Sequence, residues 1–321
     1  MRGILALVSP AFMTAPCDAP VWLRNLLPDS LTLEDCRRFY AEEIQYAANL
    51  RSRALVDAFA RVPREDFLGP GPWRIGVADL ASGGAVDYQA TASSDPRHLY
   101  HNVTVALDAS RNLCNGQPAS LAAWLSALDL QPGNRVFHLG CGVGYFTAII
   151  AEVVGLTGQV IACDVDEPLA TRAQQNLVGY PSVTVCAADG ASVDPGPCDA
   201  IFINAGVTHP LPQWLDRLAE GGRMLLPLTI PMGPGLGKGM MVKITRQCDS
   251  FHAKVASLVA IYSCTSVRET DVEPLLAKAM TTGVLFRLKS LRRDQHDQTD
   301  TCILHSRTFC LSSAELPARS T

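Results

Sequence analysis

The residues best suited to chemistry in this chain are three glycines and an aspartate that follow apolar runs. Gly140, Gly142 and Gly144 come directly after one largely apolar run, and Asp164 ends the next one. Glycine lets the backbone turn sharply and approach a ligand without a Cβ in the way. An acidic side chain at the end of the neighbouring parallel strand can accept hydrogen bonds from both ribose hydroxyls of a nucleoside. The spacing therefore predicts a site for a nucleoside cofactor.

The residue at position 145 helps to decide which nucleoside cofactor such a turn could bind. The dinucleotide fingerprint Gly-x-Gly-x-x-Gly needs a glycine where this chain has Tyr145, which argues against NAD. No Gly-Lys-Ser/Thr follows the glycines, which argues against a nucleoside triphosphate. The remaining cofactor carries adenosine without phosphate, and S-adenosylmethionine fits. The alternative is an ordinary turn between a strand and a helix that binds nothing.

Predicted strands and helices alternate through the middle of the chain. Helices are expected at 169–177, with Asp166 as the cap, and at 211–219. Strands are expected at 136–139, 159–164, 183–186, 199–204 and 223–227. This alternation predicts an α/β fold with a parallel, doubly wound sheet.

Six short motifs are spread over residues 50 to 230. They are Val62-Pro-Arg-Glu-Asp-Phe67, Asn115-Gly-Gln-Pro118, Leu130-Gln-Pro-Gly-Asn-Arg-Val136, Ala188-Asp-Gly190, Cys198-Asp-Ala-Ile-Phe202 and Leu218-Ala-Glu-Gly-Gly-Arg223. In this order they resemble the landmarks of the protein-L-isoaspartate O-methyltransferases, a family of class I S-adenosylmethionine-dependent methyltransferases. The resemblance implies a Rossmann-like methyltransferase fold with a mostly parallel seven-stranded sheet. It also implies an N-terminal helical and loop extension and a small C-terminal addition.

The same resemblance implies roles for individual residues. The residues that would bind the cofactor are Gly140, Gly142, Gly144, Asp164, Asp189 and Gly190. Asp189 would accept a hydrogen bond from the adenine amino group, although Asp-Gly is also a common turn pair. Gln117 would lie in the segment that closes over the reacting groups. Members of the family usually carry Ser or Thr where this chain has Gly116, and glycine cannot supply that hydroxyl.

The chemistry of the methyl acceptor decides whether a base is needed. A carboxylate has a reference pKa of about 4 and is ionised at neutral pH, so it needs only positioning. A hydroxyl or amine acceptor would need a base such as His209 or His101, and a packing or capping role is the alternative for His209. The catalytic candidates are therefore Gly116, Gln117 and His209.

Three functions remain open from the sequence. The leading prediction is methyl transfer to a protein or peptide carboxylate, such as a damaged isoaspartyl site, in protein repair. Gly116 favours the first alternative, a methyltransferase for a small molecule or a modified peptide. The second alternative is a binding module that keeps the fold and the cofactor without catalysis.

The segment before the glycines is expected to cover the site. Residues 32–60 show helical spacing typical of one long or two short amphipathic helices, with Thr32 as the cap. Residues 69–113 are rich in Gly, Pro, Asp and Ser and predict a long irregular segment. We expect this segment and Gln117 to cover the cofactor and shape the acceptor pocket. Three residues within it are acceptor contacts or, alternatively, loop-packing residues: Tyr100, His101 and Asn102.

Composition argues against several classes of partner. The formal charge of −4 and the absence of a long Lys/Arg run argue against nucleic acid. The eleven cysteines are scattered without a Cys-x-x-Cys pair, so we expect small core residues in a reducing compartment and no metal or redox site. No segment is apolar over the length that spans a bilayer. The apolar run 3–8 mimics a short signal peptide, but Pro10 interrupts it, and we expect a cytoplasmic monomer.

These patterns divide the chain into four segments. They are a flexible N-terminus (1–30), a helical and cap segment (31–115), the S-adenosylmethionine-binding core (116–265) and a C-terminal extension (266–321). Within the core, 233–239 is expected to be a turn between two strands, and 251–262 another strand. Residues 271–311 predict a helix and a strand pair, with a solvated charged stretch at 291–294.

Overall fold

The computed structural model describes residues 31–78 and 86–316. The predicted flexible N-terminus and the apolar run 3–8 lie outside the described residues. Within the described ranges, no helix combines the length and the apolar character that crossing a membrane requires.

The described chain begins with three helices, α2 (Leu33–Ala47), α3 (Arg53–Arg61) and α4 (Glu65–Leu68). Thr32 caps α2: its hydroxyl accepts the Asp35 N–H at 3.1 Å, while the Asp35 carboxylate accepts the Thr32 N–H. Asn49 has a φ of 49°, a left-handed conformation that does not occur inside a right-handed helix, so α2 and α3 are separate. The prediction of two short helices, with Thr32 as the first cap, is confirmed.

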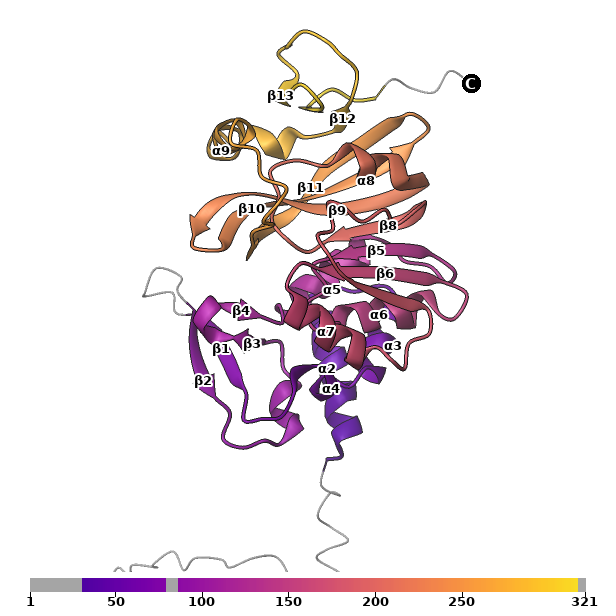
Figure 1. Ribbon diagram of the computed structural model, residues 1–321, viewed down its shortest axis with the longest axis vertical. Helices are drawn as coiled ribbons and strands as arrows, with labels where there is room; N and C mark the ends of the chain where they lie inside the picture. The colour runs from indigo at the N-terminus through magenta and orange to yellow at the C-terminus, as the bar shows by residue number, and fades with distance from the viewer. Residues whose placement is uncertain (1–30, 79–85, 317–321) are drawn as a thin grey trace, which may run out of the picture.

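A small antiparallel sheet follows the helices, so the prediction of an irregular segment at 69–113 was wrong. Its strands lie in the order β2–β1–β3–β4 and are β1 (Arg74–Ala78), β2 (Val86–Ala90), β3 (Thr104–Asp108) and β4 (Leu113–Cys114). Two short 3₁₀ turns, η2 (Pro96–Leu99) and η3 (Ala109–Arg111), connect them. Each strand has at most five residues, which is too short for a visible alternation of apolar and polar residues. Figure 1 shows this sheet beside α4, near the N-terminal end of the described chain.

The main sheet has ten strands in the order β13–β14–β12–β11–β10–β9–β8–β5–β6–β7. The parallel strands are β5 (Arg135–Leu139), β6 (Gln159–Asp164), β7 (Val183–Ala187), β8 (Cys198–Ile203) and β9 (Leu218–Gly233). The antiparallel strands are β10 (Leu236–Gln247), β11 (Ser250–Tyr262), β12 (Ser290–Arg292), β13 (Cys302–His305) and β14 (Cys310–Ser312). Strands β5 to β11 form the predicted seven-stranded sheet, with the predicted turn between β9 and β10, and three short strands extend it beyond β11.

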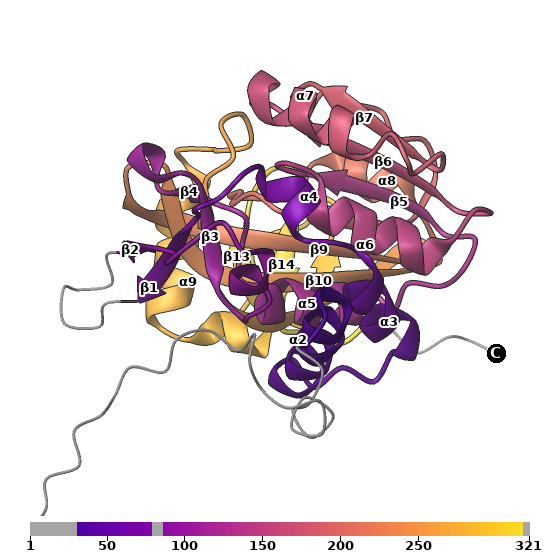
Figure 2. The same ribbon diagram turned by 90° about the horizontal axis from the view of Figure 1, so that it is seen from below.

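Helices cover both faces of this sheet, as a doubly wound fold requires. Residues of α2, α3, α5 (Pro118–Ala127), α6 (Tyr145–Val154) and α7 (Glu167–Asn176) form one apolar core with the sheet. Residues of α8 (Pro212–Arg217), α9 (Val272–Thr281) and η4 (Val284–Arg287) form the core on the other face. Asp166 caps α7 as predicted, accepting the Leu169 N–H at 3.2 Å. Figure 2 shows the small sheet β1–β3 on the side away from β6 and β7.

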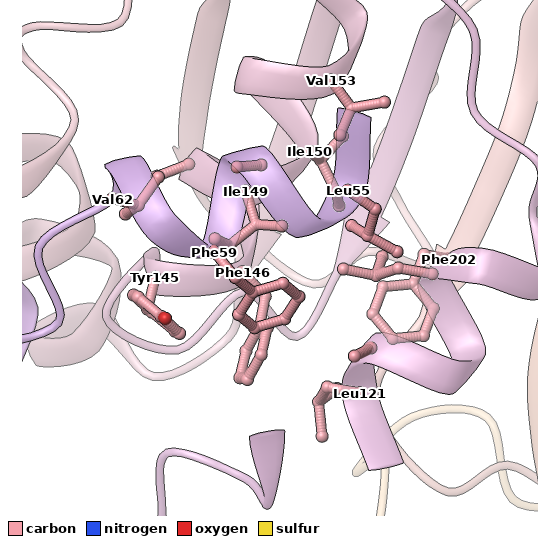
Figure 3. Packing of buried hydrophobic residues seen from close by; sticks show 14 of the residues in the cluster. Leu55, Phe59, Val62, Leu121, Tyr145, Phe146, Ile149, Ile150, Val153 and Phe202 are labelled. Carbon is pink, nitrogen blue, oxygen red and sulfur yellow. The ribbon is translucent and has the colours of Figure 1, made fainter. Parts of the chain in front are cut away.

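The N-terminal helices share the core of the methyltransferase sheet. Leu55 and Phe59 of α3 lie among the side chains of α6 (Figure 3), and the rings of Phe59 and Tyr145 are 6.4 Å apart. Both aromatic residues are fully buried. The division of the chain at residue 115 stays a prediction, and the segments on its two sides fold around one core.

Three predictions beyond β8 need correction. The helix predicted at 211–219 ends at Arg217, because Leu218 is already extended and pairs with Cys198 as the first residue of β9. The stretch 291–294 is not wholly solvated, because Leu291 is buried on β12, although Asp294 and Arg292 form a surface ion pair. The helix predicted after residue 271 is α9, and three strands follow it where a pair was expected.

Candidate active site

The carboxyl ends of four parallel strands meet at one edge of the main sheet. Leu139 pairs with both Cys163 and Ile203, and Asp164 pairs with Ala187. Ligands of doubly wound sheets bind at this edge, at the point where the connections that follow two neighbouring strands run to opposite faces of the sheet. In this chain that point lies between β5 and β8. The predicted cofactor residues all follow these strands, so the structure brings them together at one edge.

The glycine turn after β5 leaves its backbone open at one position. Gly140, Gly142 and Gly144 have φ values of 76°, 56° and 92°, which glycine adopts without strain. A Cβ on Gly142 would meet no atom within 4 Å, whereas a Cβ on Gly144 would lie 2.7 Å from the Leu177 side chain. Gly144 therefore permits close packing of α6 against the end of α7. Gly142 leaves room for a ligand against the main chain.

Asp164 lies directly beside this turn. One carboxylate oxygen accepts the Gly142 N–H at 2.8 Å, and the other accepts the Asp166 N–H at 3.0 Å. Burial raises the pKa of Asp164 above its ordinary value, and these two N–H groups oppose the rise. A carboxylate offers about four acceptor positions, so both oxygens can still accept hydroxyl hydrogen bonds. The geometry therefore suits a ribose at this place.

Asp189 and Gly190 follow β7 and close the same edge. The Asp189 Oδ1 atom accepts the Ala191 N–H at 2.9 Å and the Ser266 hydroxyl at 2.8 Å. Its Oδ2 atom has no hydrogen-bond partner among the described residues. A Cβ on Gly190 would lie 2.3 Å from Leu139, so only glycine fits there. Asp189 and Gly190 thus form the Asp-Gly turn that was the alternative expectation. They also leave the Oδ2 atom of Asp189 available to a ligand.

Gly116 and Gln117 precede α5. Gly116 has a φ of 77°, and a Cβ there would lie 2.9 Å from the Leu121 side chain. A Ser or Thr at this position would therefore be strained in this backbone. Gln117 is exposed at the N-terminal end of α5, and its Oε1 atom accepts the Ser120 hydroxyl at 3.4 Å. The roles of both residues in catalysis stay predictions.

A buried arginine holds the segment that leads to α5. Arg64 is fully buried and donates to the carbonyl groups of Leu99 at 2.6 Å, His101 at 3.1 Å and Val103 at 2.7 Å. Its guanidinium also lies 5.8 Å from the centre of the Tyr40 ring. A planar guanidinium with several donors suits such a set of fixed carbonyl groups. Arg64 therefore sets the path of residues 99–103.

Of the three residues expected to contact the acceptor, Tyr100 and Asn102 instead pack the segment 99–103 against its neighbours. Tyr100 is buried, and its hydroxyl contacts Glu65 and accepts the Arg64 N–H at 3.2 Å. The Asn102 side chain accepts the Ala119 N–H at 2.9 Å, which ties the segment to the start of α5. His101 is exposed. The contacts of Tyr100 and Asn102 support the loop-packing alternative.

His209 lies on the loop between β8 and α8 and has both ring nitrogens engaged. Its Nδ1 atom is 2.8 Å from the Thr208 hydroxyl, and its Nε2 atom is 3.2 Å from the Glu269 carboxylate. The ring stacks on Phe309 at 6.0 Å. Burial lowers the pKa of His209, and Glu269 opposes that shift. These contacts favour the packing alternative, and the predicted role as a base stays a prediction.

Several residues at the site were not predicted from the sequence. Asn204 donates to the Gly140 carbonyl at 3.3 Å, and Ser266 donates to Asp189 from beyond the predicted core. The Asn115 Nδ2 atom is buried without a hydrogen-bond partner in the described chain, next to Gly116. Asn115 lies inside a motif noted above, so the sequence held a signal for it. No sequence pattern singles out Ser266.

The sequence profile of one family matches this chain over more than half its length. The profile is Protein-L-isoaspartate(D-aspartate) O-methyltransferase, and it matches residues 93–266. A relative from Aeropyrum pernix, named protein-L-isoaspartate O-methyltransferase, is 29% identical over 67% of this chain and 75% of its own. Protein-L-isoaspartate O-methyltransferase 1 of Archaeoglobus fulgidus is 33% identical over 62% of this chain and 82% of its own.

Solved structures have the same fold. A protein-L-isoaspartate O-methyltransferase matches with a TM-score of 0.57 and 21% identity over 76% of this chain and 69% of that one. A Plasmodium falciparum protein described by the same activity, in complex with S-adenosyl-L-homocysteine, matches with a TM-score of 0.54. Its identity is 16% over 71% of this chain and 98% of that one. From the matched profile, this chain belongs to the protein-L-isoaspartate(D-aspartate) O-methyltransferase family of S-adenosylmethionine-dependent enzymes.

Proposed function

We propose that this chain transfers the methyl group of S-adenosylmethionine to the free carboxylate of an isoaspartyl residue in a protein or peptide. The observation that supports this proposal is that one fold combines an open backbone at the sheet edge with a fixed segment at the start of α5. The carboxyl edge of β5 to β8 offers an open backbone at Gly142 beside Asp164. The segment held by Arg64 contacts the start of α5 through Asn102, beside Gly116 and Gln117.

The cofactor would lie along the sheet edge. Asp164 would accept the ribose hydroxyls, and the Asp189 Oδ2 atom would accept from the adenine amino group. The backbone at Gly142 would contact the cofactor directly, since no atom lies within 4 Å of a Cβ built there. Gly140, Gly144 and Gly190 would shape this surface, because a Cβ on any of them meets a neighbouring residue at 3.0 Å or less.

The acceptor would lie at the start of α5. The N-terminal end of a helix carries partial positive charge and favours an anion. An ionised carboxylate placed there needs no base, so the residues of this chain have to orient it and exclude water. Bound S-adenosylmethionine supplies a methyl carbon already activated by its sulfonium. The acceptor carboxylate would receive this methyl group, and S-adenosyl-L-homocysteine would be the leaving group.

A second acceptor class is favoured by Gly116. The hydroxyl that the family usually places there is missing, and the positive φ of Gly116 disfavours any residue that could restore it. A small molecule or a modified peptide that supplies its own hydrogen-bond partner would suit such a site. We keep it as the second candidate function.

Labelled methyl transfer tests these proposals. The enzyme is incubated with labelled S-adenosylmethionine and an isoaspartyl peptide, with the matching aspartyl peptide as control and the host's small-molecule extract in parallel. Label in the isoaspartyl peptide alone supports the first proposal. Label in the extract alone supports the second, and label in none of the samples contradicts both.

The biological setting proposed for this activity is protein repair in the cytoplasm by a monomer. The acceptor would be a damaged protein or peptide. The formal charge of −4 gives no electrostatic preference for nucleic acid or for an anionic membrane surface.

A further inference from the structure

Four nitrogen and sulfur side chains converge in the C-terminal extension, away from the site described above. Their ligand atoms all lie within 4.8 Å of one another. The residues are His296, Cys302, His305 and Cys310. Three of them belong to the short strands β13 and β14, and His296 lies on the loop that leads into β13. These strands are the yellow segments at the C-terminal end of the described chain in Figure 1.

An irregularity in β13 brings the ligands to one face. Residues three apart on a regular strand point to opposite faces, so Cys302 and His305 would be separated. The register between β13 and β14 shifts between Cys302 and Leu304, which is the signature of a bulge. An extra residue in the strand turns Cys302 to the face of His305. His305 pairs directly with Cys310 across the hairpin.

The spacing of the atoms fits one tetrahedral metal ion. Ligand atoms bonded at about 2.0 to 2.3 Å to a tetrahedral zinc lie about 3.3 to 3.8 Å from one another. The Nε2 atom of His296 and the Sγ atom of Cys302 are 3.6 Å apart. The rings of His296 and His305 meet edge to face with centres 4.8 Å apart, which keeps both rings within reach of one ion.

The surroundings orient these ligands as a metal site requires. The Nδ1 atom of His296 lies 2.9 Å from the Asp294 carbonyl, so an Nδ1–H donor leaves Nε2 as the ligand atom. The Thr299 N–H donates to the Cys302 sulfur at 3.3 Å. The Nδ1 atom of His305 is buried without a hydrogen-bond partner in the described chain. A buried polar atom without a partner is costly, and a metal ion would satisfy it.

We propose that these four residues bind a zinc ion that fastens the loop carrying His296 to the β13–β14 hairpin. Two thiolates and two imidazoles are a preferred ligand set of structural zinc, and hard cations such as magnesium prefer oxygen ligands. Binding would release the proton of each thiol. For Cys302 and Cys310 this proposal differs from the expectation that the cysteines are small core residues without a metal. The sequence did not reveal the cluster because the ligand spacing is irregular and depends on the bulge.

The ion would act on strands that are too short to be stable alone. Strands β12, β13 and β14 have three, four and three residues. Residues 293–301 before β13 contain no helix or strand. Phe309, next to Cys310, stacks on His209 of the loop between β8 and α8. Leu304 and Leu311 belong to the core that includes α8 and α9. Zinc would therefore hold the hairpin in the position that this packing needs.

Metal content of the full chain tests the proposal. The wild-type protein is expected to purify with about one zinc per chain and, when reconstituted with cobalt(II), to show the absorption bands of a tetrahedral thiolate site. His296→Gln is the first variant, since His296 lies on a loop and its loss removes no strand pairing. It is expected to weaken metal affinity at least about tenfold. The double variant Cys302→Ser and Cys310→Ser is expected to bind none.

The control variant is Cys248→Ser, which changes an exposed cysteine outside the cluster and should retain the metal. Circular dichroism of each variant shows whether the main fold persists. Three results would overturn the proposal: wild-type protein that takes up neither zinc nor cobalt, a His296→Gln variant with unchanged affinity, or a disulfide between Cys302 and Cys310 in protein kept under reducing conditions. Failure of this test leaves the proposed methyl transfer unaffected, because no step of it uses the metal.

Discussion

At the scale of single residues, the proposed cofactor site depends most on Asp164. Its two oxygens already accept the backbone N–H groups of Gly142 and Asp166, which fixes the carboxylate at the sheet edge. Asp164→Asn keeps the shape of the side chain but replaces one acceptor oxygen by a donor. Losing a hydrogen bond to a charged group costs about 1.5 to 3 kcal/mol, which is roughly ten- to hundredfold in affinity.

Isothermal titration calorimetry with S-adenosyl-L-homocysteine measures this loss of affinity. Asp194→Ala serves as the control, because Asp194 forms a surface ion pair with Arg217 outside the glycine turn. The control should bind like the wild-type protein. Equal affinity of Asp164→Asn and wild type would refute the ribose assignment.

Gly116 gives a prediction about stability. Gly116→Ser introduces the type of residue that the family usually carries, but here φ is 77° and a Cβ would lie 2.9 Å from Leu121. We expect a loss of about 1 to 3 kcal/mol in the free energy of unfolding, and no gain of methylation. Urea denaturation measures it, with Gly179→Ser as the control, since a Cβ on Gly179 meets no atom within 4 Å. A Gly116→Ser variant as stable as this control would show that the backbone there is not strained by a side chain.

At the scale of elements, the position of the cap segment depends on Arg64. Its guanidinium donates to three carbonyl groups of residues 99–103, and Asn102 then contacts the start of α5. Arg64→Lys keeps the charge but not the planar array of donors. We expect a raised KM for the acceptor peptide, because the segment before Gly116 shifts, with little change in the affinity for S-adenosyl-L-homocysteine.

Steady-state kinetics and titration of the same samples separate these two quantities. Arg53→Lys is the matched control, because Arg53 is exposed on α3 and pairs with Asp57 one turn away. A variant at Arg64 that loses cofactor affinity and acceptor affinity equally would argue for a general loss of structure. An unchanged KM would argue that Arg64 does not position the acceptor segment.

The elements also show what the sequence could predict. The parallel strands β5, β6 and β8 were predicted because strands buried on both faces read as continuous apolar runs. The glycine turn and Asp164 were predicted because their residue types are tied to backbone geometry and hydrogen bonding. Strands β1 to β4 were missed because each is short and their pairing depends on contacts distant in sequence. The contacts of Arg64 with residues 99–103 were missed for the same physical reason. The cluster of His296, Cys302, His305 and Cys310 was missed because its irregular ligand spacing depends on the bulge in β13.

At the scale of the whole molecule, the fold places three segments around one sheet. The N-terminal helices share a core with α6 on one face, and α8, α9 and the short C-terminal strands form the core on the other. In the strand order, β8, β5, β6 and β7 are consecutive, and β9 separates them from the antiparallel strands β10 and β11. The cap segment reaches the carboxyl edge of β5 to β8 through the ion pair of Arg111 with Asp166, and the C-terminal extension reaches it through Ser266. We expect this arrangement to methylate the free carboxylate of an isoaspartyl residue.

Mass spectrometry of a single peptide pair tests this claim most directly. An isoaspartyl peptide and its aspartyl twin are each incubated with the enzyme and S-adenosylmethionine, and the site of any added methyl group is located by fragmentation. We predict a methyl ester on the free carboxylate of the isoaspartyl residue and no change in the twin. An unmodified isoaspartyl peptide, or methylation of both peptides alike, would contradict the claim.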